Sequence, residues 1–130
     1  MDITSVAASG MLAGELRLST GAANVANMQS DGAPGGASAG TAAYQPLRVD
    51  QSSLGAGGTT ATTQAVTPSS SRGYDASASY ADSSGMVAVP TVDPVTETSQ
   101  QIYGLAQFQF SAKAVSAGDA MMQAVLDIRT

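Results

Sequence analysis

The sequence contains no cysteine, no histidine and no tryptophan among its 130 residues. Without cysteine the chain can form neither a disulfide nor a thiolate metal site. Without histidine it also lacks the side chain that most often acts as a general base. Ser111 and Lys113 lie two residues apart on a predicted helix and point to different faces, and Asp75 and Asp82 lie in a stretch typical of solvated turns. We therefore predict a non-enzymatic protein with no catalytic residue, no metal site and no cofactor.

Positive charge is scarce too, since five Lys and Arg stand against ten Asp and Glu, for a net charge of −5. Nucleic acid binding needs clustered basic residues, and these five are scattered, so we predict no nucleic acid partner. No apolar run approaches the roughly 20 residues of a membrane-spanning helix, which predicts no direct membrane insertion. Asp2 replaces the basic start of a signal peptide, and Glu15 and Arg17 interrupt the apolar residues that follow. Export, if it occurs, is predicted to need no cleaved signal.

Large apolar side chains are few, because much of the apolar content is alanine and the aromatic residues are two Phe and four Tyr. Each large apolar side chain contributes roughly 1.5–3 kcal/mol when it is fully buried. A chain this poor in them gains much of its stability from neighbours. We therefore predict a homo-oligomeric assembly rather than a free monomer.

The first of three predicted segments, residues 1–28, has a helical period from Asp2 to about Asn27. One stripe of this helix carries small or apolar residues at spacings of three and four: Ile3, Ala7, Met11, Gly14, Leu18, Gly21 and Val25. Each glycine in it costs a helix roughly 1 kcal/mol relative to alanine. Two interpretations stay open: a frayed end, or a helix whose small residues let other helices approach closely on assembly.

The middle segment, residues 29–90, is rich in Gly, Ser, Thr and Ala and opens with a dense cluster of turn-forming residues at 30–36. Short β-like patches occur at 44–49 and 86–89. The segment is compatible with a flexible linker or with a packed arm.

The last segment, residues 91–130, contains the strongest helix signal, from about Pro94 to Asp127. Asp93 is a suitable N-cap, Pro94 suits the first turn, and Glu97 lies where the helix dipole favours an acid. Apolar residues recur at alternating spacings of three and four, which is typical of a heptad seam. Together the segments predict a mainly α fold, in which long N- and C-terminal helices pair as a coiled-coil-like bundle around an irregular or short-strand middle.

Both ends carry motifs that resemble the flagellar rod and hook proteins of bacteria. The N-terminal motif comprises Ser9-Gly10-Met11, Ala13, Arg17 and Ala23-Asn24-Val25-Ala26-Asn27. A second stretch, Tyr44 to Val49, is similar to a strand of the proximal-rod, C-type subunit, and Val89 to Glu97 resembles a Pro-Asn-Val-Asp box of that subunit. The chain departs from the family pattern at Phe110 and Ser111, where a small residue and Asn are usual.

The resemblance implies a structural subunit of the flagellar basal body that polymerises into the helical tube of the proximal rod and transmits torque across the periplasm. It also implies type III export without a cleaved signal peptide. The implied partners are other copies of the chain, other rod proteins and the rod-to-membrane-ring adaptor. Three alternatives are a B-type rod subunit, a secreted helical effector and a cytoplasmic adaptor.

The predicted assembly interface comprises residues of both helices: Met11, Leu18, Asn24, Val25, Asn27, Leu105, Phe108, Val115, Met122 and Leu126. The amides of Asn24 and Asn27 are expected to satisfy carbonyl groups at the helix end. The apolar members are also compatible with a core inside one chain, and in a two-helix protein some would serve both purposes.

Overall fold

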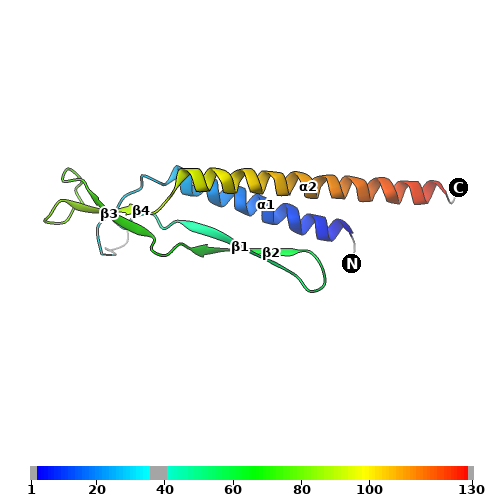
Figure 1. Ribbon diagram of the computed structural model, residues 1–130, viewed down its shortest axis with the longest axis horizontal. Coiled ribbons are helices and arrows are strands. Elements are labelled where there is room, and N and C mark those ends of the chain that lie inside the picture. The colour runs from blue at the N-terminus through cyan, green and yellow to red at the C-terminus, as the bar shows by residue number, and fades with distance from the viewer. Residues whose placement is uncertain (1–2, 36–40, 129–130) are drawn as a thin grey trace. The chain divides into compact units, whose positions relative to one another are not determined.

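Two helices bracket four short strands in the computed structural model, which describes residues 3–35 and 41–128 (Figure 1). The elements in chain order are α1 (Ile3–Ala26), β1 (Leu47–Ser53), β2 (Thr59–Ala65), β3 (Ser70–Tyr74), β4 (Met86–Pro90) and α2 (Pro94–Asp127). Both predicted helices are confirmed. Parts of the three predicted segments, at 1–2, 36–40 and 129–130, lie outside the described residues.

The predicted fold class, a mainly α coiled-coil-like bundle, is wrong. Helix accounts for 48% and strand for 21% of the structure, and the strands form two small antiparallel sheets, so the arrangement is mixed α/β. The middle segment supplies both sheets, β1 with β2 and β3 with β4. Its many threonines are β-branched and favour extended backbone, although they contribute little apolar surface.

The chain divides into two compact units. The first holds the described parts of Met1–Ser19, Val49–Thr62 and Ser99–Thr130, and the second holds Thr20–Arg48 and Thr63–Thr98. The buried apolar side chains of the described residues are Ala7 and Ala13 in the first unit and Val87, Pro46 and Pro90 in the second. Few and small, they match the expected scarcity of core-forming side chains.

In the first unit, the loop between β1 and β2 approaches α1. The Oγ of Ser9 accepts a hydrogen bond from the Thr59 amide at 3.0 Å and donates one to the Val6 carbonyl at 2.7 Å. A β-carbon built on Gly58 would lie 2.8 Å from that Oγ, and Gly58 has a φ of +88°. Glycine at this position therefore permits both the turn and the close approach.

In the second unit, β3 and β4 pair antiparallel from Ser70 opposite Pro90 to Tyr74 opposite Met86. On the other edge of β4, Ala88 exchanges two backbone hydrogen bonds with Gly32, at 2.9 Å and 2.7 Å. The turn-forming cluster that follows α1 thus extends this sheet by one bridge.

The start of α2 is capped as predicted. The carboxylate of Asp93 accepts hydrogen bonds from the amides of Val95 and Thr96, each at 3.2 Å. The Thr96 hydroxyl also donates to it, and these bonds hold the pKa of Asp93 below its usual value. Pro94 is the first helical residue, where its missing N–H costs no hydrogen bond.

Candidate assembly surface

In the first unit, α1 and α2 run antiparallel with small residues between them (Figure 1). A β-carbon built on Gly14 would lie 2.7 Å from the Gly104 carbonyl oxygen and 2.9 Å from the Phe108 nitrogen. One built on Gly10 would lie 2.5 Å from the Ser111 Oγ. The glycines permit a close helix approach at both positions, but the partner helix belongs to the same chain. Their predicted role in the approach of other helices on assembly stays a prediction.

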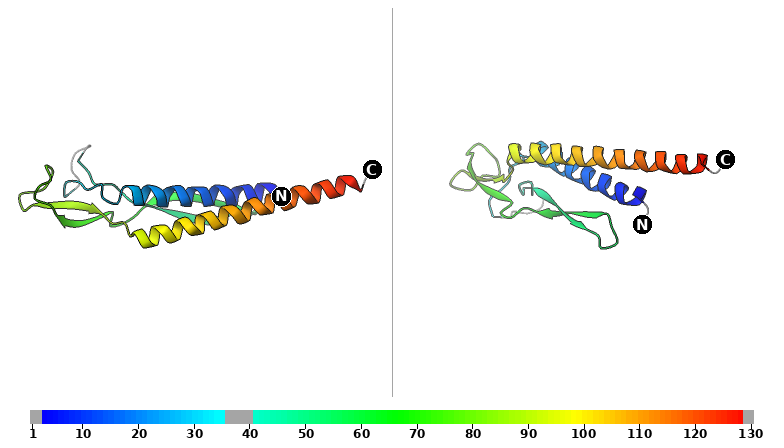
Figure 2. Two further views of the ribbon diagram at one scale, coloured as in Figure 1. Left: turned by 90° about the horizontal axis from the view of Figure 1, so that it is seen from above. Right: turned by 45° about the vertical axis from the view of Figure 1, so that its right-hand side comes forward.

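The C-terminal turns of α2 extend past the described start of α1. Gly118 is the last glycine of α2 and lies against Ile3, the first described residue of α1. Beyond it, every residue of 119–128 is exposed, and Figure 2 shows α2 continuing past the N-terminal end of α1. The large apolar side chains on this end are Met121, Met122, Val125, Leu126 and Ile128. Below, "the α2 end" means residues 119–128.

The apolar residues predicted for the interface divide into two groups by exposure. Leu18, Leu105, Met122 and Leu126 are exposed, the last two at 59% each. Met11, Val25, Phe108 and Val115 are half-buried. The exposed group leaves apolar surface for another chain to cover, and the assembly role of both groups stays a prediction.

Asn24 is fully buried in the second unit and all of its amide hydrogen-bonding capacity is used. Its Nδ2 donates to the Leu47 carbonyl at 2.6 Å and to the Glu97 Oε1 at 2.9 Å. Its Oδ1 accepts from the Tyr44 hydroxyl at 3.0 Å and from the Leu47 amide at 3.1 Å. Asn24 therefore joins the end of α1, the start of β1 and the start of α2 within one chain.

Burial changes the acid–base behaviour of two partners in this cluster. Burial, with a smaller contribution from the charge of Asp93, raises the pKa of Glu97 against the opposing hydrogen bond from Asn24. Burial and the charge of Glu97 raise the pKa of Tyr44. The cluster therefore disfavours a second negative charge near Glu97.

Asn27 has the local role predicted for it. Its Nδ2 donates to the Ala23 carbonyl at the end of α1 at 2.9 Å, and the same carbonyl accepts the Asn27 backbone amide at 3.1 Å. The two asparagines of the motif thus differ, because Asn27 bonds its own helix whereas Asn24 makes its bonds across the second unit.

The first unit contains a cavity of about 630 Å³, here called the Arg17 groove, which was not predicted from the sequence. Its lining comes from α1, β1, β2 and α2: Arg17, Gln51, Ser52, Ser53, Thr59, Tyr103, Ala106, Gln107, Phe110 and Ser111. The guanidinium of Arg17 donates to Gln100 at 2.5 Å and to Gln51 at 3.1 Å, and it lies 5.5 Å from the centre of the Tyr103 ring. These partners are amides and an aromatic ring, so none compensates the positive charge with a carboxylate.

The described residues show neither a metal centre nor a membrane span. Over 3–35 and 41–128, no three His, Cys, Asp or Glu side chains come together as a metal site would require. In the same part of the chain, no helix has the length and apolarity needed to cross a bilayer.

Comparison with protein families gives a match to part of the chain. Residues 83–128 match the family model described as the C-terminal region of the flagellar basal body rod FlgEFG proteins. This segment is therefore similar to the C-terminal region of these flagellar rod proteins. It contains β4 and all of α2, and therefore the exposed α2 end. A comparison with curated proteins gave no match.

The family match confirms the predicted resemblance to flagellar rod proteins. It supports a structural role in the rod, a location at the flagellar basal body and interaction with other rod components. The alternatives of a secreted effector and a cytoplasmic adaptor receive no support from it. Among the described residues, α2, which lies in the matched segment, carries more exposed large apolar side chains than α1 does.

Proposed function

We propose that this chain is a structural subunit of the proximal rod, of the C type, which polymerises into a helical tube and transmits torque across the periplasm. The observation that carries the proposal is the α2 end, a stretch of rod-family sequence whose large apolar residues are all exposed. An isolated chain leaves this surface in water, whereas dense packing among copies would bury it.

The assignment to the C type rests on motifs rather than on the family match. Pro90, Val92 and Asp93 resemble a box of that subunit, and Tyr44 with Arg48 resembles the strand that follows the first turn. Both stretches contribute to contacts in the second unit, where Tyr44 bonds Asn24 and Asp93 caps α2. The motif residues thus stabilise the second unit, which contains the start of α2.

The proposed partners are other copies of the chain, neighbouring rod proteins and the rod-to-membrane-ring adaptor. The chain would reach the periplasm by type III export without a cleaved signal. Its role is mechanical: packed helices share the load, and no residue performs chemistry.

A charge placed in the exposed seam tests the proposal. Leu126→Asp would bury a carboxylate in the packed rod, so we expect loss of swimming and of rod assembly. Gln123→Asp is the matched control, because it adds the same charge to the same exposed turns at a position that is already polar. Soluble chain levels are compared by immunoblot to separate assembly from turnover. Normal swimming of the Leu126→Asp strain would contradict the proposal.

A further inference from the structure

The Arg17 groove and the α2 end are complementary in charge and in polarity. The groove holds a guanidinium with no carboxylate among its hydrogen bond partners, and its rim carries Tyr103 and Phe110, which are 66% and 70% exposed. The α2 end carries the carboxylate of Asp119 beside exposed Met121 and Met122.

Two residues that line the groove also carry buried polar atoms without partners. Among the described residues, the buried side-chain atoms without a hydrogen bond are Arg17 Nε, Gln107 Oε1 and Asp31 Oδ1, and the first two belong to residues that line the groove. Folded proteins satisfy the large majority of such atoms. The hydrogen bonds of Arg17 and Gln107 are therefore incomplete in the single chain.

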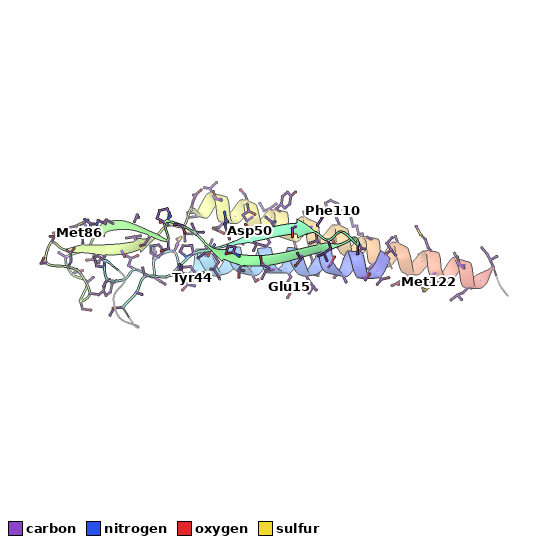
Figure 3. The ribbon with its side chains drawn as sticks, turned by 90° about the horizontal axis from the view of Figure 1, so that it is seen from below. Glu15, Tyr44, Asp50, Met86, Phe110 and Met122 are labelled. Atoms are coloured by element: carbon purple, nitrogen blue, oxygen red, sulfur yellow. The ribbon has the colours of Figure 1, made fainter. Side chains whose placement is uncertain are left out.

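The two surfaces cannot meet within one molecule. Phe110 at the groove and Met122 on the α2 end both lie on α2, as Figure 3 shows. Twelve residues of helix at 1.5 Å each hold them about 18 Å apart. Any contact between the groove and an α2 end must therefore join two copies.

We propose that the α2 end of one copy docks in the Arg17 groove of the next, with Asp119 of the incoming copy opposite Arg17. The inference rests on the proposed function, and it names the contact by which copies join. Because the two surfaces differ, the contact is heterologous. An open row of copies joined in this way has a free groove at one end and a free α2 end at the other. Such a contact generates an open filament unless its rotation closes a ring.

Cysteine cross-linking in assembled basal bodies tests the contact directly. The chain has no native cysteine, so each introduced cysteine is the only one in its chain. Phe110→Cys and Met122→Cys chains with different tags are expressed together, and purified hook–basal bodies are oxidised. We expect a disulfide-linked dimer that carries both tags. Leu12→Cys with Met122→Cys is the matched control, because Leu12 is 66% exposed but lies outside the groove lining.

Charge reversal provides an independent readout. Arg17→Glu and Asp119→Arg are each expected to abolish swimming, and the double variant is expected to recover it, because the opposite charges face each other again. The cross-linking pair leaves Arg17 intact, so a folding defect of Arg17→Glu does not affect that measurement.

The outcomes separate this inference from the proposed function. Basal bodies that contain both tagged chains but give no more mixed dimer than the Leu12 control would overturn the docking contact and leave the rod function standing. A double charge variant that swims no better than the single variants would also overturn it. Absence of the chain from basal bodies would contradict the proposed function, and the inference with it.

Discussion

Gly14→Ala tests whether α1 and α2 pack as closely as the structure shows. Alanine is the better helix former, and by propensity alone the substitution should stabilise the chain by about 1 kcal/mol. The new β-carbon, however, would lie 2.7 Å from the Gly104 carbonyl oxygen and 2.9 Å from the Phe108 nitrogen. Both are backbone atoms and cannot rotate away, so the helices must separate or distort.

The cost of such overpacking is about 1–3 kcal/mol, which equals or exceeds the gain in propensity. We therefore expect a net loss of up to about 2 kcal/mol. Gly118→Ala is the matched control, because its β-carbon would meet only the Ile3 Cγ2 at 3.0 Å, a side-chain methyl group rather than a backbone atom. The control is expected to be neutral or to stabilise the chain by up to about 1 kcal/mol.

The assay is urea unfolding of the purified chain, followed by the far-UV circular dichroism of its helices. Gly14→Ala should lower the midpoint and Gly118→Ala should not. If both substitutions raise the midpoint to a similar extent, helix propensity dominates at both positions. The close approach of the two helices would then be refuted.

Three further predictions concern the second unit. Asn24→Ala removes an amide with four hydrogen bonds and should lower the free energy of unfolding by about 2–3 kcal/mol. Asn27→Ala should lower it by about 1 kcal/mol or less. Equal effects of the two substitutions in urea unfolding would argue against the Asn24 cluster. The pKa of Glu97 is raised in the folded chain, so protonated Glu97 stabilises the folded state. This stabilisation is complete below the ordinary pKa of 4.5 and is lost as the pH rises through the higher pKa of the folded chain. Glu97→Gln keeps the acceptor for Asn24 and should remove this loss, and urea midpoints that follow the same pH dependence in both proteins would contradict the assignment. Gly32→Ala would drive a β-carbon into the backbone of Ala43 and should lower the melting temperature, by a loss of about 1–3 kcal/mol; an unchanged melting temperature would show that the turn adjusts.

The helices were predictable because their signals are local. Asp93, Pro94 and Glu97 mark the start of α2, and the structure begins the helix at Pro94 with Asp93 as its cap. The period of small and apolar residues likewise predicted α1, which ends at Ala26.

The fold class was mispredicted because the strands carry little apolar pattern. The patch at 86–89 was identified and lies in β4, and the patch at 44–49 overlaps β1. By contrast, β2 and β3 were missed, since the sequence of β2 is mostly threonine and that of β3 is mostly small or polar. Their hairpins are stabilised by backbone hydrogen bonds and turns, which hydrophobic periodicity does not report.

The candidate site was predictable only in part. The exposed apolar residues of α2, such as Met122 and Leu126, follow from the heptad spacing. The Arg17 groove could not be predicted, because its lining comes from four elements that are distant in the sequence. Asn24 offered a weak signal, since it lies three residues after Gly21 and so close to the inward stripe of α1, where a buried amide needs partners.

Mass spectrometry of detergent-purified hook–basal bodies, freed of membrane and loosely bound protein, tests the central claim most directly. A rod subunit should be present in a fixed proportion to the other rod proteins, and that proportion should persist through further washing. A chain that is absent from these particles, but abundant in the medium or the cytosol of the same cells, would contradict the account.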